Sequence, residues 1–248
     1  MLKLVSFDCW STLICFDKES LVKMRHIRAK DFQAILSGYG YELEEKNIQS
    51  VIKDSRKELD DIRSKTNKEF NTEETVGLIL SKLKIDNKET IFGELKKKLV
   101  EVYSGSIESM DLKVQPGTIE IFDSLKAKKI KIGLLSNTEH GDTEEKLLEK
   151  FDIAKYFDSI IFSCYFGLGK PAPEIFNKLL SELKVSPSEA VHIGDRMIDD
   201  VFGAQNAGMK AIYLKPPIDY KGEKFVEPDA TIENFFQLPS ALDKLFGN

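Results

Sequence analysis

Charged and polar side chains follow several short apolar runs of the sequence, each near the point where a run ends. The first run ends at Asp8, the second is followed by Ser136 and Asn137, and a later one ends at Asp195. Lys170 stands in a Gly/Pro-rich loop just before an expected helix. A carboxylate can act as a nucleophile or as a hard oxygen ligand for Mg²⁺, whereas a lysine or a hydroxyl can bind an anion. These residue types together suit attack on an anionic substrate.

Each of these residues also has a purely structural explanation. Asp8 could cap the turn that follows it, and the segment 136–138 (Ser-Asn-Thr) could begin a helix. Most lysines lie at the surface, and Asp199 and Asp200 stand where the helix dipole favours acidic residues. Taken singly, the signals are modest. Their order and their placement at successive strand ends favour a functional site.

Apolar runs that alternate with amphipathic patterns predict the elements that position these side chains. We expect buried strands at 2–8, 130–136, 159–163, 190–194 and 211–214. We expect helices at 117–128, 141–150, 172–183 and 199–207. This alternation predicts an α/β fold, a doubly wound parallel sheet with helices on both faces. In such sheets ligands bind beyond the carboxyl ends of the strands, where the candidate residues stand.

The stretch from about residue 18 to 107 interrupts this alternation, because it carries helical patterns and almost no strand signal. The helices expected there span 18–38, 44–64, 71–83 and 88–104. We therefore predict an all-helical domain at residues 17–107, inserted into an α/β core of residues 1–16 and 108–248. Arg25 and Arg28 share a face of the first insert helix and could hold an anion, but a solvated helix face is favoured.

The composition narrows the classes of partner. The chain has 248 residues, and its 36 basic and 41 acidic residues give a net charge of −5. This mild acidity argues against nucleic acid, whose phosphates need a basic surface. The three cysteines form no CxxC motif, which predicts free thiols in a reducing compartment. Since no run approaches about 18 apolar residues, we expect a cytoplasmic protein without membrane contact, a monomer or a homodimer, that acts on a small molecule.

Four segments resemble the motifs of the haloacid dehalogenase (HAD) superfamily. They are FDCWSTL at 7–13, LLSN at 134–137, GKPAPEIF at 169–176 and IGDRMIDD at 193–200. The later segments GAQNAGMKAIYL at 203–214 and PDATIENFFQLPSAL at 228–242 also look like that family. The helical insert stands where members of subfamily I carry a helical cap. The resemblance implies a HAD-like core, a helical cap and hydrolase activity.

The resemblance also implies roles for the matching residues. Asp8 would be the nucleophile that forms a covalent intermediate with the substrate. Ser136 and Asn137 would contact substrate oxygens, and Lys170 would neutralise charge on the nucleophile and on the transferring group. Thr12 would orient the nucleophile loop.

A Mg²⁺ ion is implied in the same way. Asp8 and Asp195 would bind it directly, as would the backbone carbonyl of Trp10, and Asp199 or Asp200 would bind it through water. Carboxylate and carbonyl oxygens are the hard ligands that Mg²⁺ requires. The ion offsets the repulsion between a carboxylate nucleophile and an anionic substrate.

Trp10 departs from the family's phosphatases, which usually carry a second Asp there that protonates the leaving group. An indole nitrogen donates a hydrogen bond but does not titrate, so the usual acid is missing. General acid catalysis typically contributes about 10²–10⁴-fold, so esters of poor leaving groups should react slowly. The Trp10 side chain could also contact the substrate or wall its pocket.

Three functions are compatible with this departure. The favoured one is a Mg²⁺-dependent phosphatase that acts on a small phosphorylated metabolite and takes its proton from elsewhere. The second is a 2-haloacid dehalogenase-like enzyme, whose branch carries Tyr at the position of Trp10 and whose halide leaves unprotonated. Asp195 argues against it, because the dehalogenases lack this residue and use no Mg²⁺. The third is a binding or regulatory module with residual activity. His192, within an expected strand, is interpreted as a packed core residue.

Overall fold

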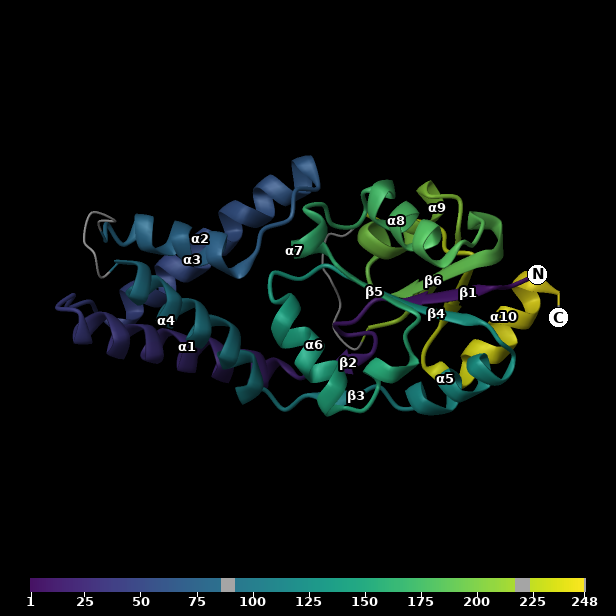
Figure 1. Ribbon diagram of the computed structural model, residues 1–248, viewed down its shortest axis with the longest axis horizontal. Helices are drawn as coiled ribbons and strands as arrows, with labels where there is room; N and C mark the ends of the chain where they lie inside the picture. Colours follow the sequence, from purple (N-terminus) through teal and green to yellow (C-terminus); the bar gives the residue numbers. More distant parts are fainter. Residues whose placement is uncertain (86–91, 217–223, 248) are drawn as a thin grey trace. The chain divides into compact units, whose positions relative to one another are not determined.

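The computed structural model describes residues 1–85, 92–216 and 224–247 and divides into two compact units (Figure 1). One unit comprises Met1–Cys15 and Lys113–Asn248, and we call it the sheet unit. The other comprises Phe16–Leu112, and we call it the helical unit. The predicted insert at residues 17–107 lies within the helical unit.

A parallel sheet of six strands forms the sheet unit, counted over the described ranges, in the order β5-β4-β1-β6-β7-β8. The strands are β1 (Leu4–Phe7), β4 (Lys131–Ser136), β5 (Ser159–Phe162), β6 (Ala190–Gly194), β7 (Lys210–Leu214) and β8 (Ala230–Ile232). Strand β1 is central, because it pairs with β4 on one side and with β6 on the other. The carboxyl ends of these three strands therefore meet where the strand order reverses, which is where such sheets bind ligands.

Helices cover both faces of this sheet, which confirms the predicted α/β fold class. The helices are α5 (Thr118–Ala127), α6 (Gly141–Lys150), α7 (Ser163–Phe166), α8 (Pro173–Leu183), α9 (Gly203–Asn206) and α10 (Leu238–Phe246). Figure 1 shows α8 and α9 on one side of the sheet and α5 and α10 on the other. The ring of Phe7 on β1 packs edge-on against Phe122 of α5 and against Phe235. Each such aromatic pair adds about 0.5–1.5 kcal/mol beyond the area that it buries.

The helix predicted at 199–207 is split, because a π-helix at Met197–Phe202 precedes α9. The backbone N–H groups of Asp200 and Val201 both donate to the carbonyl of Arg196, which widens the turn. Short π-helical segments within helices frequently occur at functional sites. Strand β8 was not predicted, because its three residues are too short for a periodic signal. Two further short strands, β2 (Ile14–Cys15) and β3 (Lys113–Val114), pair antiparallel next to the unit boundaries.

The helical unit contains α1 (Lys18–Gly38), α2 (Glu45–Thr66), α3 (Thr72–Lys82) and α4 (Phe92–Gly105). The helix predicted at 88–104 corresponds to α4, and residues 88–91 lie outside the described residues. Helix α1 begins at a cap, because Asp17 accepts a hydrogen bond from the backbone N–H of Ser20. A capping box of Asn71 and Glu74 begins α3.

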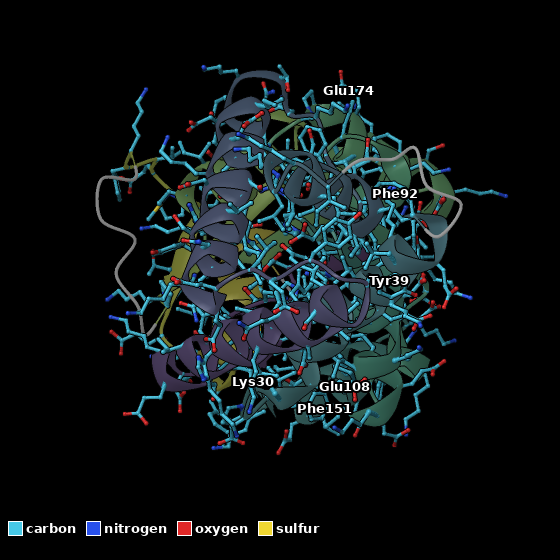
Figure 2. All side chains as sticks on the ribbon, turned by 90° about the vertical axis from the view of Figure 1, so that its left-hand side faces the viewer. Lys30, Tyr39, Phe92, Glu108, Phe151 and Glu174 are labelled. Carbon is cyan, nitrogen blue, oxygen red and sulfur yellow. The ribbon has the colours of Figure 1, made fainter. Side chains whose placement is uncertain are left out.

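The prediction of a solvated face for Arg28 is wrong. Arg28 is only 2% exposed, and its guanidinium lies 3.8 Å from the centre of the Tyr103 ring. Its side chain packs inside the helical unit, where its Nε donates to the hydroxyl of Ser106. Charged side chains such as Lys30 and Glu174 are exposed, as Figure 2 shows. No helix within the described residues is both long and apolar enough to cross a membrane.

Candidate active site

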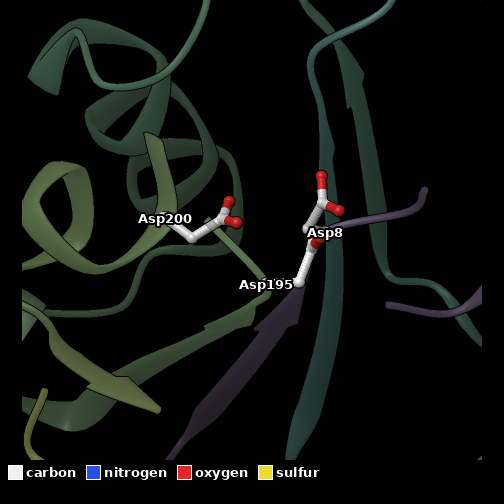
Figure 3. A group of neighbouring side chains, drawn as sticks. All are labelled: Asp8, Asp195 and Asp200. Carbon is white, nitrogen blue, oxygen red and sulfur yellow. The ribbon is translucent and has the colours of Figure 1, made fainter. Parts of the chain in front are cut away.

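Three buried carboxylates come together at the carboxyl ends of β1 and β6 (Figure 3). Asp8 directly follows β1, Asp195 directly follows β6, and Asp200 lies in the π-helix. One oxygen from each carboxylate lies within 4.8 Å of the other two. The parallel register brings Asp8 and Asp195 to neighbouring tips, since the backbone N–H of Asp8 donates to the carbonyl of Ile193 at 2.8 Å.

Lys170 brings a buried positive charge to this group. Its Nζ lies 2.7 Å from Oδ1 of Asp8 and 2.6 Å from Oδ1 of Asp200, and the residue is only 2% exposed. Burial by itself lowers the pKa of Lys170, but the charges of Asp200 and Asp8 more than offset this, so the net shift of the pKa is upward. The ammonium therefore stays protonated and bridges the two carboxylates.

Asn137 fixes the backbone of Lys170. The backbone N–H of Lys170 donates to Oδ1 of Asn137 at 2.7 Å, and Nδ2 of Asn137 donates to the carbonyl of Lys170 at 2.8 Å. Both polar atoms of the Asn137 side chain are thus engaged with the loop that carries the lysine. The sequence predicted a contact to substrate for Asn137, whereas the structure gives it a positioning contact with Lys170.

Hydrogen bonds on both carboxylate oxygens fix the orientation of Asp200. Oδ1 accepts from Lys170 and from Nε2 of His192 at 3.1 Å, and Oδ2 accepts from the backbone N–H of Arg196 at 2.9 Å. Because a carboxylate accepts, Nε2 of His192 carries the proton, and its Nδ1, 2.9 Å from the hydroxyl of Ser6, accepts. Burial raises the pKa of Asp200, but the effects of Lys170 and His192 are larger and opposite. The net shift of the pKa is therefore downward, and the group is ionised.

His192 is thus buried, as predicted, but it also supports a site residue. Of the two adjacent acids, Asp199 is not part of the carboxylate group found in the described residues. Successive residues of a helix point roughly 100° apart, so only one of the pair can face the strand tips. The absence of a side chain at Gly194 makes room for Asp200, since a Cβ there would lie 2.1 Å from its Cγ.

Burial raises the pKa of Asp8, and the charges of Asp200 and Asp195 raise it as well, so the net shift is well upward although Lys170 opposes it. The group as a whole holds three carboxylates and one ammonium in a buried place. With all three carboxylates ionised, the ammonium leaves two negative charges unbalanced, which a divalent cation would balance while favouring the ionised form of Asp8. Carboxylate oxygens are also the donors that Mg²⁺ prefers, so the residues present fit this ion.

The loop that follows Asp8 is a tight turn. The backbone N–H groups of Leu13 and Ile14 both donate to the carbonyl of Cys9, and Ser11 adopts the left-handed region with φ of 63°. Thr12 is fully buried, and its hydroxyl lies 3.4 Å from Oδ1 of Asp195. Thr12 therefore connects this loop to the acidic group.

The hydroxyl of Ser136 is buried at the tip of β4, next to β1. Over the described part of the chain it makes no hydrogen bond of normal geometry. A buried hydroxyl without a well-formed hydrogen bond is costly, and the polar neighbour of this one is Glu144, whose pKa it lowers. The role of Ser136 toward a substrate oxygen stays a prediction.

Glu144 of α6 is a residue that the sequence analysis missed. It is fully buried, and its Oε2 accepts a hydrogen bond from Nε1 of Trp10 at 2.8 Å. Burial raises the pKa of Glu144, and polar neighbours, Ser136 first among them, oppose the rise. In the sequence Glu144 resembles any acidic residue in the first turns of an amphipathic helix, so no local signal marks it.

A doubly wound sheet whose strand tips gather three carboxylates and a lysine suits a hydrolase that acts on an anionic substrate. The family model of haloacid dehalogenase-like hydrolases matches residues 2–208, and the chain belongs to this family.

Curated relatives include glyceraldehyde 3-phosphate phosphatases of archaea. The protein of Pyrococcus abyssi is 33% identical over 104 residues, which are 42% of this chain and 43% of that relative. The protein of Methanothermobacter thermautotrophicus is 29% identical over 160 residues, which are 62% of this chain and 70% of that relative. The chain thus matches less than half of the length of the Pyrococcus relative.

Solved structures of the family match nearly the whole chain. A 2-haloacid dehalogenase from Pseudomonas syringae has a TM-score of 0.73 and 25% identity, and the match covers 98% of this chain and 99% of that one. A HAD phosphatase from Thermococcus onnurineus has a TM-score of 0.63 and 22% identity, with 97% and 98% covered. The second likeness concerns the fold alone.

Proposed function

We propose that the protein is a Mg²⁺-dependent phosphatase that uses Asp8 as its nucleophile and acts on a small phosphorylated metabolite. The observation that carries this proposal is the position of the Asp8 carboxylate, 2.7 Å from the Lys170 ammonium and grouped with Asp195 and Asp200. The names of the archaeal relatives, which are phosphatases, support a phosphate ester as the substrate. We further propose that the helical unit is the cap that selects the metabolite.

The proposed chemistry has two steps. An oxygen of Asp8 attacks the phosphorus, the bond to the leaving oxygen breaks, and that oxygen takes a proton from solvent. Water then attacks the aspartyl phosphate, breaks its Asp8–phosphorus bond, and releases phosphate while the carboxylate is restored. Lys170 and the hydroxyl of Ser136 stabilise the negative charge on the phosphoryl oxygens during both steps.

Mg²⁺ would be held by the carboxylates of Asp8 and Asp195 and by the backbone carbonyl of Trp10. Both oxygens of Asp200 already accept hydrogen bonds, so this residue would act mainly by holding Lys170. When bound, the ion supplies positive charge that reduces the repulsion between the nucleophile and the phosphate.

Phosphate release from 4-nitrophenyl phosphate, measured with Mg²⁺ and with excess EDTA, tests the proposal. We expect turnover only with Mg²⁺ and its loss in Asp8→Asn, which keeps the shape but removes the nucleophile. Asp243→Asn, an exposed aspartate of α10, is the matched control and should leave the rate unchanged. Turnover that survives Asp8→Asn would refute the proposal.

A second candidate, 2-haloacid dehalogenase activity, is favoured by two observations. Trp10 replaces the leaving-group acid, which a departing halide does not need, and the chain resembles the dehalogenase of Pseudomonas syringae. Chloride release from 2-chloropropionate that persists in EDTA would select this function. Binding of Mg²⁺ without turnover of either substrate would instead favour the binding or regulatory module.

A further inference from the structure

One hydrogen bond links the nucleophile loop to the neighbouring loop of the site. Trp10 lies two residues after Asp8, and its indole N–H donates to Glu144, which lies in the first turns of α6. Helix α6 follows the loop that begins at Ser136, so the bond connects residues that are 134 positions apart. The backbone of Trp10 is held as well, through a bridge to Ile14.

The burial of Glu144 is not explained by its helix. An acidic residue near a helix N-terminus interacts well with the helix dipole while it remains in water, as the exposed Glu145 does. Burial of a carboxyl group costs free energy unless it is paired. The Oε2 of Glu144 has its partner in Trp10, whereas its Oε1 makes no normal hydrogen bond within the described residues. Ser136, Cys9 and Thr138 are polar neighbours of the same carboxyl group, but the hydrogen bond from the indole, at 2.8 Å, is the one with normal geometry.

The same bond determines what Trp10 can present to a substrate. An indole has one polar hydrogen, and in this chain that hydrogen points to Glu144. Trp10 is nevertheless partly exposed. Apart from that N–H, the surface of the indole is hydrocarbon, and it belongs to the loop that follows Asp8.

We propose that Glu144 is a positioning residue that holds the Trp10 indole as a fixed apolar platform, and that this platform selects phosphate esters with an aromatic leaving group. This inference rests on the proposed phosphatase function. An aromatic leaving group packs well against an indole face. Phenolates also leave without a proton, so such esters do not need the acid that is missing at position 10.

The single tryptophan of the chain makes the positioning directly observable, because all tryptophan emission comes from Trp10. Glu144→Leu removes both acceptor oxygens at similar size, and Glu144→Gln keeps one acceptor. We expect Glu144→Leu to shift the emission to longer wavelength and to increase its quenching by acrylamide. Glu144→Gln and the control Glu145→Gln should remain close to the wild type.

The selectivity is tested with 4-nitrophenyl phosphate and glycerol 3-phosphate. In Glu144→Leu we expect kcat/KM for the aryl ester to fall about tenfold, mainly through KM, because contact with a fixed ring is lost. The alkyl ester should change less than about twofold, because it makes little ring contact. Trp10→Ala removes the platform itself, so the ratio of kcat/KM for the aryl ester to that for the alkyl ester should fall by a similar factor, whatever happens to the absolute rates. This variant provides the kinetic test if Glu144→Leu does not fold.

Two results would overturn the inference. One is unchanged Trp10 emission in Glu144→Leu, which would show that Glu144 does not hold the ring. The other is an equal loss for both esters in Trp10→Ala, which would show that the ring does not select. The emission measurement needs no turnover, so it separates a failure of this inference from a failure of the phosphatase proposal, which would appear as an inactive wild type.

Discussion

Replacement of Gly194 by alanine should disrupt the acidic group without removing any of its members. The added Cβ would lie 2.1 Å from Cγ and 2.2 Å from Oδ2 of Asp200. Carbon atoms in contact are about 3.5–4.0 Å apart, so Asp200 must move by more than about 1 Å. Its carboxylate cannot retreat freely, because Lys170, His192 and the backbone of Arg196 all donate to it.

The expected cost follows from these contacts. Oδ1 of Asp200 lies 2.6 Å from Nζ of Lys170, and a shift of about 1 Å takes this pair beyond hydrogen-bond range. A hydrogen bond to a charged group contributes about 1.5–3 kcal/mol, and breaking a buried ion pair outright costs about 3–5 kcal/mol. Since Asp200 is displaced and not deleted, we expect the free energy of unfolding to decrease by about 3 kcal/mol. In a chain of this size that corresponds to a fall in Tm of about 6–12 °C.

Thermal unfolding followed by the emission of Trp10 measures this effect in the sheet unit. The matched control is Gly133→Ala on the neighbouring strand β4, where the Cβ would meet only the flexible end of Leu179 at 3.0 Å. That variant should lose clearly less stability, because the leucine can rotate away. Equal Tm values for Gly194→Ala and the wild type would show that the strand tip has room for a side chain. The position of Asp200 would then not depend on the missing side chain of Gly194.

Three further predictions concern the surroundings of the site. Asn137→Ala should lower kcat for phosphate release by about 100-fold with little change in circular dichroism, because it frees the backbone of Lys170. Burial lowers the pKa of His192 below its ordinary value of about 6.5. The unfolded chain therefore binds a proton at His192 that the folded chain does not bind. As the pH falls below about 6.5, the free energy of unfolding from urea titrations should decrease by at most about 1.4 kcal/mol per pH unit. His192→Gln should reduce this slope. Burial raises the pKa of Cys15 to about 11, so its alkylation by iodoacetamide at pH 8, followed by mass spectrometry, should be far slower than that of free cysteine.

Much of the sheet unit could be predicted from local sequence. The strand expected at 190–194 coincides with β6, and that expected at 130–136 differs from β4 (Lys131–Ser136) by one residue. Buried parallel strands are short apolar runs between polar turns, and this signal needs no knowledge of distant residues. The placement of Asp8 and Asp195 at strand tips follows from the same runs.

The partners of the side chains could not be predicted in this way. Asp199 and Asp200 are equivalent in the sequence, and only the turn of the π-helix and the space beside Gly194 decide which one reaches Lys170. The sequence predicted a substrate contact for Asn137, and only the structure shows that its amide binds the backbone of Lys170, 33 positions away.

By itself, the sequence determined the fold class, the helical insertion and the strand ends at which chemistry could occur, because hydrophobic periodicity records which side of each element is buried. Only the tertiary structure decided that Arg28 is internal, that Glu144 holds Trp10 and that His192 supports Asp200. These facts depend on the distance and direction between side chains on different elements. No local pattern records that geometry, because it is set by how the whole sheet unit or helical unit packs.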